Sequence, residues 1–420
     1  MVPVNTGLSI PTYNAQRFLG RQDEINAVTA AIDALYRGDN ERRRVILFRG
    51  GRGSGKSWLA LHLQRSVLSQ LSNKATSFLL LLDHIHGGGD LQENEWSPLR
   101  EAQGDQISIS ANSEQQVDEL TKKLLAWIAD RLGAARVLAH TRPTLSELTA
   151  WLPRDIEDKF QKRVLVLILD SVFEANPEFV QSLERHLLAS LVNNPKVLLV
   201  MTGRGKPPEW TSSRLRIDVE ERTLSAFDAK TTYQQLRDVD PSLAQNAEQA
   251  HHYSGGYPLA NLLFARLPPK KALIDYFGLL VGQSDADEVR LWCSALCILD
   301  AFREDVALRL LEEVSVRVGF ERVKSKLGDQ LGWLRWERGR YVWDEAIAHP
   351  TREVLKATDR DLWVRLNCAA WRAYHEKAEA DPDYSDFYNT RARRYAEHLQ
   401  QVGAETGECK GAEERVAMPA

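Results

Sequence analysis

Short apolar runs alternate with helix-patterned segments along the first half of the chain. Four runs, at 45–48, 77–82, 164–169 and 197–201, are almost wholly apolar. A continuous apolar run of this length is typical of a parallel strand covered on both faces. Residues 216–219 are expected to add an edge strand. Because helical patterns lie between these strands, the sequence predicts an α/β fold with a five-stranded parallel sheet.

The second half of the chain has mainly helical spacing. One hairpin is predicted at 333–343, where Gly339 separates two short aromatic-rich runs. Helices are expected just before it, at about 285–299, 304–314 and 320–331. Three helices followed by a hairpin indicate a winged helix.

A glycine-rich segment follows the first apolar run. It is Gly50-Gly51-Arg52-Gly53-Ser54-Gly55-Lys56-Ser57, and it matches the phosphate-loop pattern G-x-x-x-x-G-K-[ST] without a gap. A strand, a glycine-rich turn and a helix N-terminus together form an anion site, because backbone N–H groups and the helix dipole face the phosphate. Lys56 is expected to contact the β- and γ-phosphates and the Ser57 hydroxyl to bind Mg²⁺, with Trp58 next along the helix. The sequence thus predicts a bound nucleotide with Mg²⁺.

Candidate catalytic residues follow two later strands. Asp170 ends the most apolar run and is the expected second Mg²⁺ ligand, although a solvated strand-end aspartate is the alternative. Glu174 is the nearest acid that can activate water, but capping of the following helix competes equally for it. Arg204 is placed to sense the γ-phosphate and Thr202 to hold the attacking water. A surface arginine in a glycine turn is the alternative for Arg204.

Composition changes this picture little. The 420 residues are enough for two or three domains, and the net charge of −4 argues against a global basic field for nucleic acid. The four cysteines are too few and too scattered for a disulfide scaffold or a zinc site. Of these, Cys293 and Cys297 share a helical face and are expected to be buried thiols. With no signal segment and no long apolar run, a cytoplasmic location without a membrane span is expected.

Five elements, in this order, resemble the signal-transduction ATPases with numerous domains, or STAND proteins. This class includes the NB-ARC-type apoptotic and plant-resistance proteins and the NACHT proteins, and belongs with the AAA+ kind of P-loop NTPase. The matching elements are Phe18-Leu19-Gly20-Arg21-Gln22-Asp23-Glu24, the phosphate loop, Asp170, Thr202-Gly203-Arg204, and Gly256-Tyr257-Pro258-Leu259-Ala260.

The resemblance implies an ATP/ADP switch with Mg²⁺. It implies that Arg21 and Pro258 contact nucleotide and that Asp170 and Arg204 act on its phosphates. It further implies a homo- or hetero-oligomer controlled by nucleotide, and a separate effector or sensor as protein partner. Bacterial antiviral defence or stress signalling is the setting that the habits of the family suggest.

Two departures from the family pattern affect this interpretation. Ser171 follows the metal-binding acid where the plant and apoptotic branch usually has a second aspartate. This favours the NACHT pattern and gives Glu174 more weight. The winged-helix histidine of the plant-type branch is missing, since the matching residues are Val342-Trp343-Asp344. That puts the ADP-locked state in doubt.

Six segments are therefore expected. They are an irregular N-terminus (1–17), a nucleotide-binding domain (18–222), a helical lid (223–283), a winged-helix domain (284–356), a helical segment (357–402) and a disordered tail (403–420). Two other functions stay open. One is a DNA-associated ATPase of the origin-recognition or transposition-loader type, with Arg335, Arg338 and Arg340 on the wing. Nucleic acid is the less favoured partner because a wing packed within the chain competes with it. The other is a scaffold that holds nucleotide without hydrolysis.

Overall fold

The computed structural model describes residues 13–39, 43–82, 92–97, 114–204, 209–282, 285–316, 318–406 and 409. The chain divides into two compact units, which are described separately. The N-terminal unit comprises Ile10–Gly50 and Ser54–Ser225. The C-terminal unit comprises Ala226–Ala420 and also Gly51–Gly53.

The N-terminal unit is built on a parallel sheet of six strands in the order β3-β2-β4-β5-β1-β6. The strands are β1 (Val45–Arg49), β2 (Ala75–Leu81), β3 (Glu95–Trp96), β4 (Val164–Asp170), β5 (Val197–Gly203) and β6 (Val219–Thr223). The prediction of five strands was therefore wrong by one. The two residues of β3 are too few to show any periodicity in the sequence.

The edge strand was also misplaced. Residues 216–219 were predicted as a strand, but α10 (Ser213–Ile217) occupies most of that range and β6 begins at Val219. Three residues of β6, Glu220, Glu221 and Arg222, are charged, as is common for an edge strand. An edge strand of this composition lacks the apolar run that identified the central strands.

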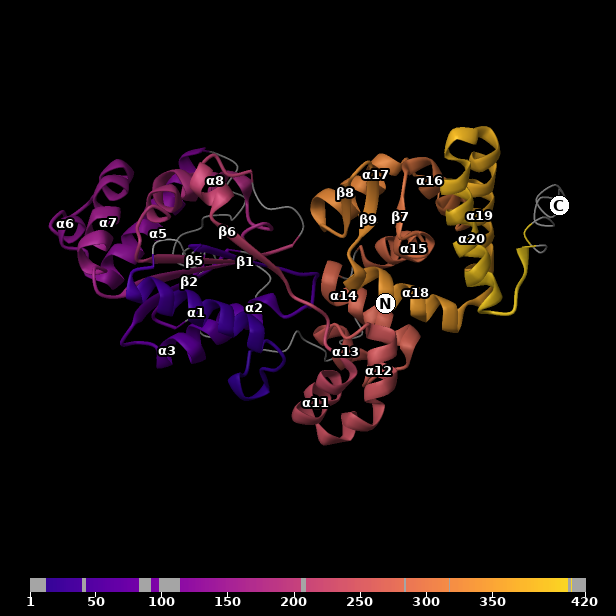
Figure 1. Ribbon diagram of the computed structural model, residues 1–420, viewed down its shortest axis with the longest axis horizontal. Helices are drawn as coiled ribbons and strands as arrows, with labels where there is room; N and C mark the ends of the chain where they lie inside the picture. The colour runs from indigo at the N-terminus through magenta and orange to yellow at the C-terminus, as the bar shows by residue number, and fades with distance from the viewer. Residues whose placement is uncertain are drawn as a thin grey trace, which may run out of the picture. The chain divides into compact units, whose positions relative to one another are not determined.

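Helices cover both faces of this sheet, and Figure 1 shows α1 and α2 on one side with α5 and α8 on the other. Alternate side chains of β1 lie on opposite faces of the sheet. Ile46 and Phe48 pack with α1 and α2, whereas Val45 and Leu47 pack in the core on the opposite face. The helices are α1 (Gln22–Arg37), α2 (Lys56–His62), α3 (Leu68–Gln70), α5 (Glu114–Leu132), α6 (Ala135–Leu138), α7 (Leu145–Lys159), α8 (Pro177–Leu183) and α9 (Ala189–Leu191), with short turns η1 (Ala15–Arg17), η2 (Leu63–Val67) and η3 (Glu184–Leu188).

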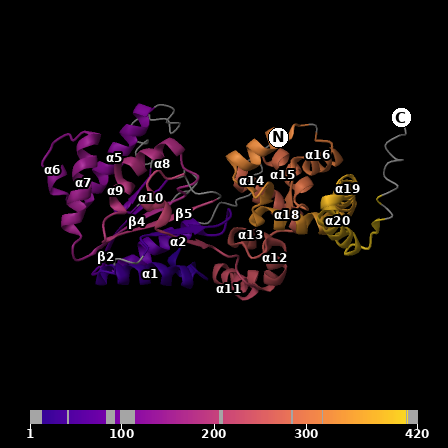
Figure 2. The same ribbon diagram turned by 45° about the horizontal axis from the view of Figure 1, so that its top comes forward.

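The C-terminal unit is mainly helical. Its helices are α11 (Ala229–Val239), α12 (Ala247–Ser254), α13 (Pro258–Phe264), α14 (Pro269–Val281), α15 (Ala286–Leu296), α16 (Glu304–Glu313), α17 (Phe320–Lys324), α18 (Glu345–Thr358), α19 (Arg360–Ala380) and α20 (Ser385–Gln400), with turns η4 (Pro241–Asn246), η5 (Ser325–Gln330) and η6 (Pro382–Tyr384). Figure 2 shows α19 and α20 lying along one another. One apolar core runs from α11 to α20.

A small antiparallel sheet, β7-β9-β8, lies between the helices of this unit. Its strands are β7 (Ala301–Phe302), β8 (Leu334–Glu337) and β9 (Arg340–Trp343). The hairpin β8–β9 turns at Arg338 and Gly339, which both have positive φ. The aromatic runs on either side of Gly339 thus form two paired strands, as the sequence predicts.

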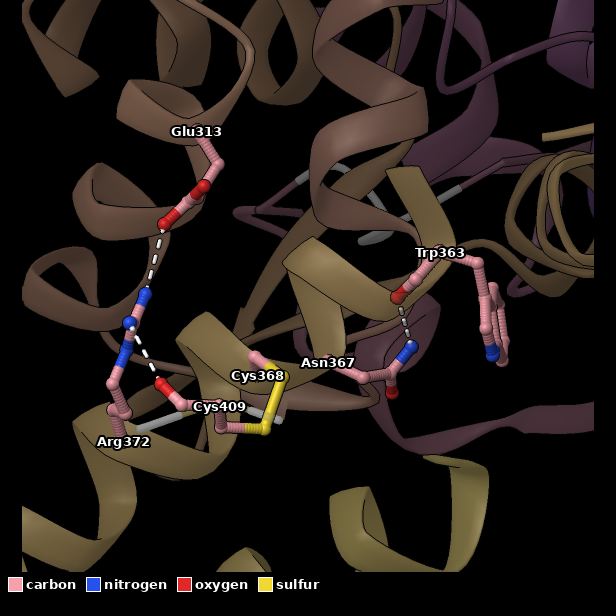
Figure 3. The surroundings of a disulfide bond; sticks show 6 residues. All are labelled: Glu313, Trp363, Asn367, Cys368, Arg372 and Cys409. Atoms are coloured by element: carbon pink, nitrogen blue, oxygen red, sulfur yellow. Dashed lines mark hydrogen bonds and ion pairs between the residues drawn. A yellow bond between two sulfur atoms is a disulfide. The ribbon is translucent and has the colours of Figure 1, made fainter. Parts of the chain in front are cut away.

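Two of the four cysteines are free thiols and the other two form a disulfide. Cys293 and Cys297 are fully buried thiols of the α15 region, as expected from their spacing. Cys368 of α19 and Cys409 form a disulfide, which was not predicted from the scattered positions of the four cysteines (Figure 3). The Cys409 carbonyl also accepts a hydrogen bond of 3.3 Å from Arg372. Part of the segment predicted to be disordered is therefore buried against α19.

Two negative findings concern the described residues alone. Among them, no helix is both long enough and apolar enough to cross a membrane. Within the same ranges, no group of three or more histidine, cysteine or acidic side chains is arranged to hold a metal ion.

Candidate nucleotide-binding site

The phosphate loop joins β1, which lies between β5 and the edge strand β6, to α2. Gly55 lies directly before α2 with φ of +92°, a conformation that L side chains rarely adopt. Lys56 follows as the first residue of the helix and is buried, and its Nζ donates to the Gly50 carbonyl over 2.8 Å. Ser57 and Trp58 lie in the same first turn. The N-terminus of α2 and the lysine ammonium thus meet at one end of β1, which suits an anion.

Arg21 connects the entry segment to this loop. Its side chain is 3% exposed and donates to the Ser54 carbonyl and to the Ser225 carbonyl, each over 2.8 Å. The Glu24 Oε1 atom lies 3.7 Å from Nη1 of Arg21. Burial lowers the pKa of the Arg21 guanidinium from its usual value. The structure thus shows Arg21 holding the loop backbone, a positioning role that the sequence did not predict.

Asp170 ends β4 and is fully buried. Its Oδ1 accepts a hydrogen bond of 2.5 Å from the Thr202 hydroxyl at the end of β5. The same hydroxyl accepts a bond of 3.0 Å from the Ser171 amide. A buried carboxylate held this way is inconsistent with the alternative of a solvated strand-end aspartate.

Ser171 adopts a left-handed conformation with φ of +59°. A non-glycine residue in this region costs roughly 1 kcal/mol or more and is often found at functional sites. The chain therefore turns sharply after Asp170. The Glu174 amide closes this turn by donating to the Ser171 carbonyl over 3.2 Å.

The turn brings Glu174 to Arg204. Their side chains form an ion pair of 2.7 Å between Arg204 Nε and Glu174 Oε1, and each is 11% exposed. The second carboxylate oxygen of Glu174 is buried without a hydrogen-bond partner among the described residues. The N-terminus of α8 is capped by Asn176, whose Oδ1 accepts a hydrogen bond of 3.1 Å from the Phe179 amide. The capping role considered for Glu174 is therefore ruled out.

Gly203 permits this close arrangement. A Cβ built on it would lie 2.3 Å from the Phe173 ring, closer than real contacts allow. The Gly203 carbonyl also accepts a bond of 3.4 Å from the Gly50 amide. The end of β5 is thus packed between the phosphate loop and the turn that carries Glu174.

The remaining predicted residues belong to the C-terminal unit. Gly51, Arg52 and Gly53 are assigned to it, as is Pro258. Pro258 is the first residue of α13, and its carbonyl accepts a bond of 2.9 Å from Gln235. Gly256 before it has φ of +82°, and a Cβ there would lie 2.0 Å from the Phe227 carbonyl oxygen. The Gly-Tyr-Pro turn is therefore a specific backbone structure rather than an ordinary helix start.

A phosphate loop between the first strand and helix of a parallel sheet, with Asp170 at the end of β4, which β5 separates from β1, defines the class of protein. The chain has the α/β fold of a P-loop NTPase. No family model and no curated protein matches the chain.

Several solved structures are similar at low sequence identity. A Walker-type ATPase of Pyrococcus abyssi is 16% identical, with 83% of this chain and 98% of that chain covered and a TM-score of 0.47. Cdc6p from Pyrobaculum aerophilum is 14% identical, with 84% and 96% covered and a TM-score of 0.41. A STAND protein with a tetratricopeptide repeat sensor from Pyrococcus horikoshii is 15% identical, with a TM-score of 0.34. The match covers 93% of this chain but 54% of that protein.

Proposed function

We propose that this chain is a STAND-type switch that binds ATP with Mg²⁺, hydrolyses it slowly, and changes its assembly state with the nucleotide bound. The observation that carries the proposal is the network at the ends of β4 and β5. There Asp170 is bonded to Thr202, and Glu174 is paired with Arg204. Both pairs lie in the unit that holds Lys56 and β1. These residues would supply the acid, the base and the cation that phosphoryl transfer to water needs.

Triphosphate binding is assigned to the start of α2. Lys56 now donates to the Gly50 carbonyl, a neutral acceptor in its own loop. A phosphate oxygen is a stronger, charged acceptor for an ammonium, so bound nucleotide would compete well for this bond. The Ser54 hydroxyl is buried without a hydrogen-bond partner among the described residues, so it too has bonding capacity to offer a ligand.

The oxygen donors of the site suit Mg²⁺. Ser57 offers a hydroxyl and Asp170 a carboxylate, and magnesium prefers such hard ligands while keeping several waters. Bound Mg²⁺ would neutralise charge on the β- and γ-phosphates. Thr202 holds the Asp170 carboxylate in one orientation, so it is a positioning residue for that ligand.

Hydrolysis is assigned to Glu174 as the group that orients or deprotonates water. One of its carboxylate oxygens is held by Arg204, and the other is buried and unbonded within the described ranges. That second oxygen is the one available to accept a proton from water. When Arg204 turns toward a γ-phosphate instead, Glu174 is released, so nucleotide and base are coupled through one arginine.

Single-turnover phosphate release tests this assignment. Glu174→Gln keeps the size of the side chain and removes its basicity, so it should slow the chemical step by about 10²-fold or more while ATP still binds. Glu178→Gln, on the exposed first turn of α8, is the matched control and should leave the rate unchanged. If the wild-type protein releases no phosphate in a single turnover, the scaffold hypothesis prompted by Ser171 replaces hydrolysis.

DNA binding by the wing is the second candidate, and two contacts weigh against it. Arg335 pairs with Glu337 over 3.0 Å, and the Arg340 guanidinium lies over the Phe387 ring of α20. Two of the three wing arginines are therefore engaged within the chain. A salt-dependent mobility shift with duplex DNA that Arg338→Glu abolishes would favour the DNA-associated ATPase instead.

A further inference from the structure

A cavity of 390 Å³ lies within the C-terminal unit, far along the chain from the phosphate loop. Its walls come from β7, β9, the start of α16, and the pair α19–α20 with the η6 turn between them. Aromatic side chains dominate the lining: Phe302, Tyr374, Tyr384, Phe387 and Tyr388. A volume of this size lies in the range of small-molecule sites, roughly 300–1,000 Å³.

Two arginines contact the Phe387 ring. Only Arg340 is among the residues that line the cavity, whereas Arg391 donates to the Ala301 carbonyl over 3.4 Å. The Arg340 guanidinium lies 4.7 Å from the centroid of Phe387, and that of Arg391 lies 5.6 Å from the same centroid. Among the described residues, neither guanidinium forms an ion pair with a carboxylate. The neighbouring cations differ, since Lys377 pairs with Asp305 and Arg394 pairs with Asp300.

The lining of the cavity contains more basic than acidic side chains. Arg303, Arg340 and Lys377 line it with Asp381 as the single acid in the same lining, and Lys377 is already paired with Asp305. The Arg340 guanidinium, which has no carboxylate partner among the described residues, can therefore pair with an anion in the cavity. Tyr374 adds a phenol that can donate a hydrogen bond, and burial raises its pKa to about 12. The cavity thus offers ring faces, cations and a hydrogen-bond donor together.

We propose that this cavity binds a small planar aromatic anion, that is, an aryl ring carrying a phosphate or carboxylate. The ring would pack among Phe387, Tyr384 and Phe302, and the anionic group would pair with Arg340. Such a site is independent of the nucleotide bound at the phosphate loop.

The test is calorimetric titration of the full-length protein with 1-naphthyl phosphate. Inorganic phosphate is the probe without a ring, and 1-naphthol is the probe without a charge. We expect 1-naphthyl phosphate to bind at least about tenfold more tightly than either, because ring and anion are recognised together. Arg340→Gln on the hairpin should weaken it by about tenfold. Arg391→Gln on α20, whose side chain is not part of the lining, should weaken it less.

Matched controls separate this site from other basic surfaces and from the phosphate loop. Arg338→Gln on the same hairpin and Arg393→Gln on the same helix are exposed and should leave the affinity unchanged. Lys56→Ala should also leave it unchanged. Equal affinity in all arginine variants, equal binding of 1-naphthol, loss of binding in Lys56→Ala, or no binding at all would each overturn the proposal. Thermal unfolding of each variant confirms that it is folded.

Discussion

At the scale of single residues, the site depends on one hydroxyl. Thr202 donates to the buried Asp170 carboxylate and accepts from the Ser171 amide. Three polar groups from two strands are thereby satisfied in a place without exposure to water. Since an unsatisfied buried polar group is expensive, this threonine is expected to matter for stability as well as for metal binding.

Thr202→Val keeps the shape of the side chain and removes both bonds. We expect it to lower the free energy of unfolding by about 2–4 kcal/mol, because a carboxylate and an amide lose a partner. It should also weaken Mg²⁺-dependent ATP binding. Urea unfolding and nucleotide titration measure the two effects. Thr390→Val on the exposed face of α20 is the control, and a similar loss of stability there would contradict the explanation.

His62 gives the N-terminal unit a dependence on pH. Its ring stacks on Phe18 with centroids 3.8 Å apart, and its Nδ1 lies 3.0 Å from the Tyr13 hydroxyl. Burial lowers the pKa of His62 below its ordinary 6.5. At a pH between the folded and the unfolded pKa of His62, the unfolded chain binds more protons than the folded chain. The stability that the neutral His62 ring contributes is therefore fully present above about pH 6.5 and is lost as the pH falls.

His62→Gln should therefore make the free energy of unfolding fall less steeply with acid than in the wild-type protein. Denaturant unfolding at pH values from about 5 to 7 measures the slope. His375→Gln on the half-exposed side of α19 serves for comparison and should keep the wild-type slope. If both variants show the wild-type slope, His62 is not the group responsible.

At the scale of elements, the sequence predicted what strong periodicity can show. The four apolar runs became β1, β2, β4 and β5, and Asp170, Thr202 and Arg204 lie at strand ends as their positions indicated. The parallel pairing of β4 with β5 then places Asp170 and Thr202 at the same edge of the sheet. The carboxyl ends of parallel strands meet at one edge of a sheet, so this part of the site could be anticipated, although the order of the strands could not.

What the sequence could not show depends on contacts between distant residues. The orientation of Glu174 is set by the left-handed turn at Ser171, which no propensity signals. The position of Arg21 depends on carbonyls of Ser54 and Ser225 that are far apart in the chain. The pairing of Cys368 with Cys409 likewise requires the packing of the last segment on α19.

The disulfide is expected to stabilise the end of the C-terminal unit. It closes a loop of 41 residues, for which the chain-entropy model gives an upper estimate of about 4 kcal/mol. Reduction should therefore lower the melting temperature of the oxidised protein. Cys368→Ser should melt at the lower temperature with or without a reducing agent. An unchanged melting temperature after reduction of the wild-type protein would show that the bond contributes nothing to stability.

At the scale of the whole molecule, nucleotide binding is linked to the stability and to the assembly state of the protein. Nucleotide that binds the folded protein stabilises it by RT ln(1 + [L]/Kd), or about 2.7 kcal/mol at a hundredfold excess over Kd. Binding alone does not make a switch. ATP and ADP must also differ in how strongly each one prefers one conformational state of the protein over the other. Sedimentation velocity with ATP and with ADP should therefore give different profiles, with and without partner proteins. Identical profiles in all conditions would contradict the switch but not nucleotide binding.

The most direct measurement is calorimetric titration of the protein with ATP in the presence of Mg²⁺. The account predicts one site per chain in the wild-type protein and an affinity at least about tenfold weaker in Lys56→Ala, because the ammonium contacts the phosphates. Lys74→Ala, which removes a partly exposed lysine paired with Asp33, should bind like the wild-type protein. Absence of binding to the wild-type protein, or equal binding to Lys56→Ala, would contradict the assignment of this loop as a nucleotide site.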